Sequence, residues 1–198
     1  MGAARGFRCH ARERAPASRG QRNGCALGDV ATVYRTRGRP PAGSILRVLA
    51  LDINEDSIHI VHQKPGYSDA DAIVHFHVAK LIYLGEVFAG DGYPAIDPAQ
   101  GGTLAGLLST LDAWAGTTFR FVPARGEVTN GASVKAFRDM IVAVRDRVKH
   151  RMDEGRTEAQ ILAEHPTADF DARWGKGRLQ PDQFVHAVYA ALKNGNQE

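Results

Sequence analysis

The amino-acid sequence predicts an α/β layered fold, in which a mixed β-sheet carries helices packed on one of its faces. Residues 45–84 contain four segments with the composition of β-strands, and a fifth strand-like segment follows at 119–123. A helical pattern of apolar residues begins at residue 104, before the fifth strand, and recurs in three later segments. Helices on one face of one sheet satisfy this order, and they leave the other face or an edge uncovered unless something else packs there.

The first two predicted strands form a pair. They cover residues 45–53 and 57–62, and the turn-forming cluster at 54–56 joins them. Ile58 and Ile60 alternate with their neighbours, as expected for a strand with one face on a core.

The next two predicted strands, 72–76 and 80–84, lead out of and into short loops. The segment 85–103 is rich in Gly and Pro and is predicted to be a long irregular connection. Such connections in compact domains are usually functional rims or lids. The strand at 119–123 then delivers another short loop.

Four helices are predicted in the rest of the chain. The first helix is expected to start after Thr103 as its N-cap, and the second covers about 132–153. The third starts at the capping-box spacing 157–160 and ends at Pro166, and the fourth starts at Pro181. The first helix shows its apolar stripe most clearly, at Leu104, Leu107, Leu108, Leu111 and Trp114.

Charge divides the chain into two parts of opposite sign. Residues 1–47 hold ten Arg and two acidic residues, a balance of 10 − 2 = +8, whereas residues 48–198 hold 15 basic and 20 acidic residues, a balance of 15 − 20 = −5. Because residues 1–44 lack apolar periodicity, we predict a disordered Arg-rich tail there and a domain at 45–195, with a terminal helical segment at 130–195. The mildly acidic domain offers no basic face to nucleic acid.

Two cysteines, Cys9 and Cys25, both lie in the predicted tail. Two thiols without metal-type spacing form no disulfide framework. The chain has no apolar run of a signal peptide or a membrane helix, so a cytoplasmic protein without a membrane partner is expected.

Three short loops carry the residues that bear on chemistry. The sequence reads Gly-Tyr-Ser-Asp-Ala-Asp at 66–71, Gly-Glu at 85–86 and Pro-Ala-Arg-Gly at 123–126. In this order the loops resemble the C-terminal half of the metallo-β-lactamase superfamily, which carries His-Thr-x-Gly-Asp, Gly-Asp and Pro-Gly-His-Gly there. The similarity covers roughly residues 46–193 and implies one half of an αββα sandwich.

The resemblance implies a dinuclear zinc hydrolase, in which a metal-bound hydroxide attacks the substrate. The ligand positions of the three loops correspond to Tyr67, Glu86 and Arg125. Glu86 is a competent ligand, whereas a phenol is mostly protonated at neutral pH and a guanidinium cannot ligate at all. Asp69 and Asp71 flank Tyr67 and are further candidates for a metal, with turn capping as their structural alternative.

Other histidines do not complete the site. The His-x-His-x-Asp-His motif, which would supply most ligands from the N-terminal half of these hydrolases, is absent before residue 57. His75 and His77 form a His-x-His pair without a following Asp-His, and we expect a partly exposed strand position rather than a stray metal site. His59 and His62 do not share a strand face, so structural roles are expected.

No other catalytic motif offers an alternative. The sequence has no G-x-S-x-G elbow, P-loop or G-x-G-x-x-G, which leaves serine hydrolases, nucleotide hydrolases and Rossmann enzymes without support.

Two functional hypotheses follow. The first is a truncated or degenerate metallo-β-lactamase-like hydrolase, with weak or no metal-dependent hydrolysis on its own, whose missing ligands come from an upstream segment or another chain. The second is a non-catalytic binding or interaction protein on the same scaffold. In it, Arg125 pairs with Glu86, replaces the charge of the metal and favours an anionic ligand. The catalytic residues and the substrate are not specified by the sequence, and a homo-oligomer is left open.

A third hypothesis, nucleic-acid binding, rests on residues 1–44 alone. Because this binding would act through charge, the affinity of the full chain for duplex DNA should fall steeply between about 50 and 200 mM salt, and deleting residues 1–44 should abolish it. Fluorescence anisotropy with a labelled duplex measures both effects. Binding that survives the deletion would contradict a site in the tail.

Overall fold

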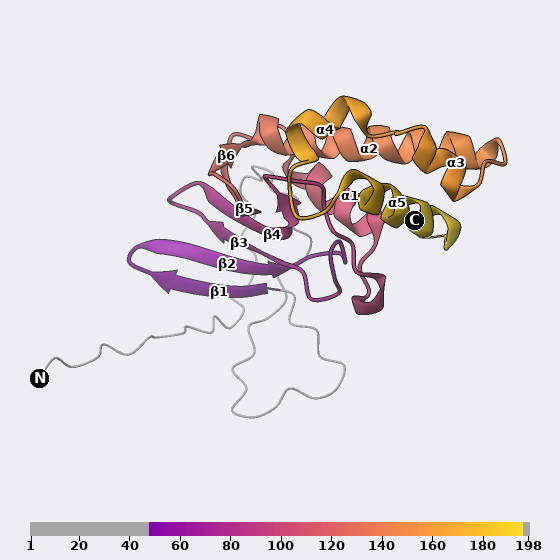
Figure 1. Cartoon of the computed structure of the whole chain (residues 1–198). Helices are drawn as coiled ribbons and strands as arrows, with labels where there is room; N and C mark the ends of the chain where they lie inside the picture. Colours follow the sequence, from indigo (N-terminus) through magenta and orange to yellow (C-terminus); the bar gives the residue numbers. More distant parts are fainter. Residues whose placement is uncertain (1–47, 196–198) are drawn as a thin grey trace, which may run out of the picture.

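A computed structural model describes residues 48–195 of the chain (Figure 1). Some predictions lie outside the described residues: the tail at 1–44 with its two cysteines, Cys9 and Cys25, and residues 45–47 at the start of the first predicted strand.

Six strands form one mixed sheet in the order β1-β2-β3-β4-β5-β6. Neighbouring strands are antiparallel except β4 and β5, which are parallel. A parallel pair needs a crossover, and α1 (Leu104–Trp114) provides it. The strands are β1 (Val48–Ile53), β2 (Asp56–His62), β3 (Ala72–Phe76), β4 (Leu81–Ala89), β5 (Arg120–Arg125) and β6 (Thr129–Asn130).

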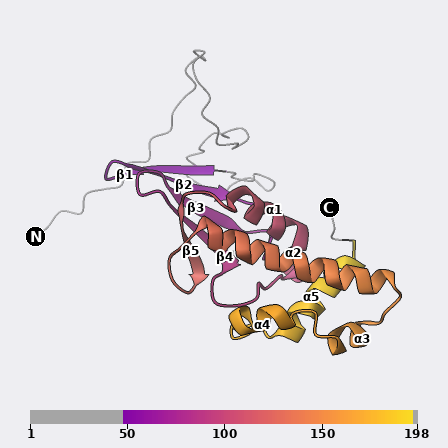
Figure 2. The same ribbon diagram turned by 90° about the horizontal axis from the view of Figure 1, so that it is seen from above.

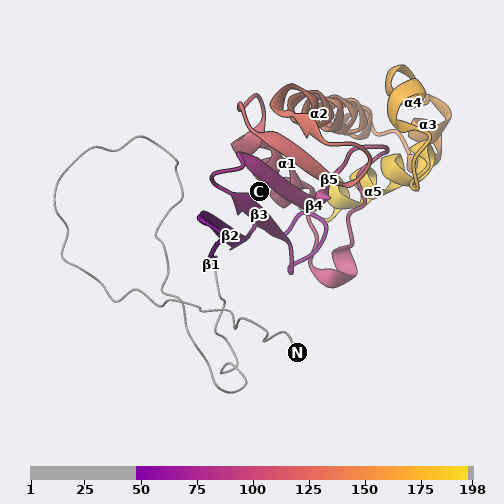
Figure 3. The same cartoon turned by 90° about the vertical axis from the view of Figure 1, so that its left-hand side faces the viewer.

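The helices gather on one side of this sheet (Figures 1 and 3). From above, α2 starts beside β5 and runs beyond the sheet towards α3 (Figure 2). The predicted α/β class with helices on one face is therefore confirmed. No helix of residues 48–195 combines the length and the apolarity that crossing a bilayer requires. The remaining helices are η1 (Pro98–Gln100), α2 (Gly131–Asp153), α3 (Glu158–Ala163), α4 (Ala168–Trp174) and α5 (Pro181–Lys193).

Three elements were not predicted, and all are short. β6 has two residues, η1 has three and α4 has seven, so none is long enough to show a periodic apolar pattern. The caps at Thr103 and Thr157 are confirmed, because each side chain accepts a hydrogen bond from the first turn of its helix.

The prediction that Gly85 and Glu86 form a loop is wrong. β4 continues through both residues to Ala89, with register shifts against β5 on either side of Gly85. Gly85 has φ of 59°, a conformation that glycine adopts without strain, and it forms a bulge inside the strand. Pairing with β5 keeps the chain extended beyond the bulge.

The start of α1 packs closely against the loop that carries Tyr67. A Cβ atom at Gly106 would lie 1.7 Å from the carbonyl oxygen of Pro65, and one at Gly102 would lie 2.0 Å from that of Tyr67. Between these glycines, the Thr103 hydroxyl donates a hydrogen bond to the Pro65 carbonyl at 2.8 Å. Only glycine permits this approach, and it fixes the loop on the helix.

The core lies between the sheet and the helices. Its sheet side consists of side chains on alternate positions of β3, β4 and β5, and its helix side comes mainly from α1, α2 and α5. Among the most deeply buried members are Ile73, Ile82, Leu84, Phe121, Leu107, Leu111, Phe137, Ile141 and Phe184.

His75 is part of this core, so the expectation of a partly exposed position is wrong for His75, whereas His77 is half-buried. Its side chain is 4% exposed and packs edge-on against the rings of Trp114 and Phe119. His77 lies with its ring centroid 3.9 Å away, and His77 Nε2 is 2.9 Å from His59 Nδ1. The reason is the register: His75 pairs with His59, and both positions face the helices.

The register of β2 also decides where its apolar residues point. Because His59 and Val61 face the helices, Ile58 and Ile60 face the other side of the sheet. The alternation seen in the sequence is real, but its most apolar positions lie on the face that the helices leave open.

We predict that His75 makes the protein sensitive to acid. Burial and the neighbouring His77 and His59 lower the pKa of His75 to about 4, while the carboxylate of Asp56 opposes the shift. In the unfolded chain the pKa of a histidine is ~6.5, so between pH 6.5 and 4 the unfolded state binds a proton that the folded state does not. The contribution of neutral His75 to the free energy of unfolding is therefore complete above pH 6.5 and is lost as the pH falls towards 4. Compared with His75→Phe, the wild type should lose roughly 2 kcal/mol more unfolding free energy between pH 7 and pH 4.5.

Urea unfolding followed by circular dichroism at both pH values measures the difference. His150→Gln is the matched control, because that side chain is 71% exposed. Equal pH dependence in the wild type and His75→Phe would refute the prediction.

Candidate functional site

The three regions singled out from the sequence meet at one edge of the sheet. β2, β4 and β5 point in the same direction, because β2 and β4 are both antiparallel to β3 and β4 is parallel to β5. Tyr67 follows the end of β2, Glu86 lies in the second half of β4, and Arg125 is the last residue of β5. The carboxyl ends of these strands therefore gather all three residues.

An ion pair joins the two charged residues at this edge. Arg125 Nη1 donates a hydrogen bond to Glu86 Oε1 at 3.0 Å. The side chains are 33% and 40% exposed, so the pair lies at the rim of the fold rather than in the core. This hydrogen bond raises the pKa of Arg125, which keeps the guanidinium charged. The pairing of Arg125 with Glu86 that was expected from the sequence is present.

Asp91 adds a second carboxylate, which the sequence interpretation missed. Its Oδ1 lies 3.8 Å from Arg125 Nε, close enough for an ion pair but too far for a hydrogen bond. Arg125 Nε is buried and has no hydrogen-bond partner among residues 48–195. The sequence does carry a signal for Asp91, since it stands between Gly90 and Gly92 in the loop directly after β4.

Tyr67 is the fourth residue of the cluster. It is the smallest of the contributors that raise the pKa of Arg125, after Glu86 and Asp91, so it lies within electrostatic range of the guanidinium. Its side chain is half-buried in the loop held by α1. We call Tyr67, Glu86, Asp91 and Arg125 the rim cluster.

Asp71 and Asp69 have other surroundings. The carboxylate of Asp71 accepts hydrogen bonds from the backbone N–H groups of Gly66, Tyr67 and Ser68, at 2.9, 2.7 and 3.1 Å, and from the Ser68 hydroxyl at 3.2 Å. Asp71 therefore stabilises the loop, which is the turn-capping role that the sequence offered as the alternative to metal binding. Asp69 is exposed.

The other histidine of the β2 strand serves the same loop. His62 Nε2 lies 2.6 Å from the carbonyl oxygen of Asp69, which ties the end of β2 to the loop. His62 and His59 therefore make different contacts on opposite faces of the strand, in line with the structural roles expected for them.

Tyr93 holds the connection after β4 against the C-terminal helices. Its hydroxyl donates a hydrogen bond to Asp171 Oδ1 at 2.7 Å, and its ring stacks on Phe184 at 4.9 Å between centroids. Burial, followed by the bond to Asp171, raises the pKa of Tyr93. The segment predicted as an irregular connection is thus pinned in place, which also positions Asp91.

The residues at the rim do not fit a zinc ion. Zinc needs three or four N, O or S ligands, and of the rim cluster only the two carboxylates can serve. Both of them pair with Arg125, whose fixed positive charge repels a dication. Within residues 48–195 no group of three or more His, Cys, Asp or Glu side chains is arranged to hold a metal ion.

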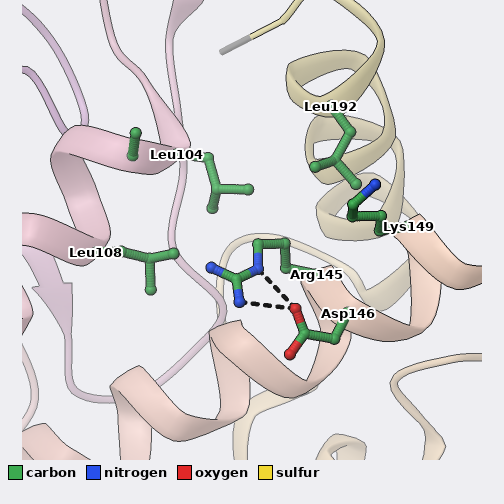
Figure 4. A pocket seen from close by; sticks show the side chains of 7 residues that line it. Leu104, Leu108, Arg145, Asp146, Lys149 and Leu192 are labelled. Carbon is green, nitrogen blue, oxygen red and sulfur yellow. Dashed lines mark hydrogen bonds and ion pairs between the residues drawn. The ribbon is translucent and has the colours of Figure 1, made fainter. Parts of the chain in front are cut away.

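A hollow lies elsewhere, between α1, α2 and α5 (Figure 4). It has a volume of about 250 Å³ and combines apolar walls with Arg145 and Lys149. Arg145 is paired with Asp146 and Lys149 with Asp153, so both cations are already neutralised. None of its lining residues belongs to the rim cluster.

Comparison with known proteins identifies the fold but not the activity. No family model matches the sequence, and no curated protein matches it either. Among solved structures, a double mutant of a sec-alkylsulfatase superposes with a TM-score of 0.58 at 14% identity, over 74% of this chain and 25% of that one. A metallo-β-lactamase family protein from Thermus thermophilus superposes with a TM-score of 0.50 at 14% identity, over 74% of this chain and 47% of its own.

This chain therefore spans a quarter to about half of the length of these neighbours. At such low identity the likeness concerns the fold alone. Together with the sheet order and the one-sided helices, it assigns a metallo-β-lactamase-like fold to the described residues.

Proposed function

We propose that this chain is a relative of the metallo-β-lactamase-fold hydrolases that performs little or no metal-dependent hydrolysis on its own and acts as a non-catalytic interaction protein. The observation that carries the proposal is the ion pair between Arg125 and Glu86, 3.0 Å apart at the carboxyl ends of the parallel strands. Ligands bind preferentially at this kind of edge in α/β sheets, and here a protein charge stands there.

Electrostatics supports the loss of metal chemistry. A metal at the rim would have to displace the guanidinium from Glu86 and would then lie beside an uncompensated cation. It would gain two carboxylates in exchange, Glu86 and Asp91, which is fewer than a catalytic zinc site uses. Tyr67 adds a phenol, which is a poor ligand at neutral pH.

The charge of the rim cluster gives little support to an anionic ligand. Arg125 contributes +1, while Glu86 and Asp91 contribute −2, so the balance is 1 − 2 = −1. An anion would have to compete with two carboxylates that already hold the guanidinium. We therefore keep the hypothesis of a non-catalytic interaction protein, but we do not propose that its ligand is an anion.

We expect the rim pair to be energetically coupled. Glu86→Ala and Arg125→Ala should each destabilise the fold, and the double variant should lose less than the sum of the two, by about 0.5–1 kcal/mol for a pair that is partly exposed. Urea denaturation of the four proteins measures this coupling energy.

A matched control pair is available on α2. Lys135 and Asp139 form an exposed ion pair at 2.5 Å, with no place at the strand ends. Its coupling should stay near that of ordinary helix pairs, about 0.3–0.5 kcal/mol. Strict additivity of Glu86→Ala and Arg125→Ala would remove the main support for the proposal.

We also expect the purified full chain to hold less than stoichiometric zinc. The double variant Tyr67→His/Arg125→His would place two imidazoles beside the Glu86 carboxylate. These three side chains equal the number of protein ligands in a catalytic zinc site, so this variant should bind zinc measurably. Metal analysis by mass spectrometry after dialysis against zinc compares the two proteins.

Two controls make the metal experiment specific. Arg120→His adds an imidazole to the same strand, away from the rim, and should bind no zinc; adding Glu86→Ala to the double-histidine variant should abolish its binding. Stoichiometric zinc in the wild type that disappears in Glu86→Ala would favour the hydrolase hypothesis instead.

A further inference from the structure

The sheet face that no helix covers is apolar along five strands. We call it the open sheet face. Strand register places these side chains opposite the core, and none of them is buried within the described structure. They are Leu49, Leu51, Ile53, Ile58, Ile60, Val74, Phe76, Leu81, Tyr83 and Val122.

This pattern differs from that of a sheet with one wet face. Antiparallel strands with a solvated face alternate apolar positions towards the core with polar positions towards water. In the first part of β2 the order is reversed, since Ser57 and His59 face the helices while Ile58 and Ile60 face outwards; at its end, Val61 faces the helices in the usual way. Tyr83, 38% exposed, is one of only three large hydrophobic residues among residues 48–195 that are classed as exposed. Contiguous apolar surface of this kind marks an interaction site.

The charge at the end of this face is balanced. Asp56 and Arg120 share the orientation of the apolar side chains, and their charges sum to 1 − 1 = 0. Both are anchored to the turn between β3 and β4: the Val78 N–H donates to Asp56 at 2.8 Å, and Arg120 donates to the Ala79 carbonyl. Two such faces can therefore approach each other without net repulsion.

Residues 1–47 do not have the composition of a cover. They contain eight large apolar residues of the types Leu, Ile, Val, Met, Phe and Tyr, against ten Arg. Burying the outward side chains under this segment would also bury guanidinium groups without partners, which is costly. Residues 1–47 are therefore a poor candidate for the cover.

We propose that this cover is a second copy of the chain, packed face to face. An apolar face without net charge can pack against a copy of itself, which is what the isologous interface of a two-fold dimer requires. Two stacked sheets with helices outside would bury both open faces in one apolar layer. This inference concerns a surface other than the rim cluster and does not depend on the absence of metal binding.

Light scattering coupled to size-exclusion chromatography tests the proposal on the full chain. The wild type at tens of micromolar should elute with twice the monomer mass of 21.5 kDa. Ile60→Lys places a charge at the centre of the open sheet face and should raise the dimer dissociation constant by about a hundredfold or more, giving the monomer mass. Val128→Lys makes the same change at a side chain that is exposed elsewhere and should leave the dimer intact.

Hydroxyl-radical footprinting of the wild type covers the case in which Ile60→Lys fails to fold. Oxidation of Phe76 and Tyr83 should fall as the protein concentration rises, while that of Tyr189 on α5 should not change. A wild type that is monomeric at all concentrations would overturn the proposal, even if a different polypeptide then bound the open sheet face. A dimer that persists in Ile60→Lys, or footprints that do not depend on concentration, would overturn it as well.

Discussion

The parallel pairing of β4 with β5 is the constraint on which the rest of the structure depends. It requires a crossover, so α1 must lie on the sheet, and the glycines at the start of that helix then lock the Tyr67 loop in place. It also brings the carboxyl ends of both strands to the same edge. Glu86 and Arg125, 39 residues apart in the sequence, meet there because the strands that carry them are neighbours.

The same edge bears on the proposed loss of hydrolase chemistry. The position that gathers ligands is a property of the strand arrangement, whereas the chemistry depends on which side chains the strands deliver. Here they deliver a guanidinium, which pairs with a carboxylate at the rim of the fold, where a metal ion would otherwise supply the positive charge. The likeness to longer proteins of metallo-β-lactamase type is therefore a likeness of framework, at 14% identity.

The two faces of the sheet show a second consequence of the register. The helix side contains a histidine cluster around His75, and the opposite side carries aliphatic residues such as Ile60 and Val74. The helix side also carries the buried core, so the sheet has apolar residues on both faces, and the helices among residues 48–195 cover only one of them.

The sequence by itself determined the layered α/β class, most helix starts and the residue types at the rim, because periodicity, caps and ligand chemistry are local properties. It also supported the pairing of Arg125 with Glu86. It could not determine that β4 continues through Gly85, that His75 is buried, or that Asp91 joins the rim. Those depend on which strands pair, in which register, and on which face the helices lie, and only the tertiary structure decides these contacts between distant residues.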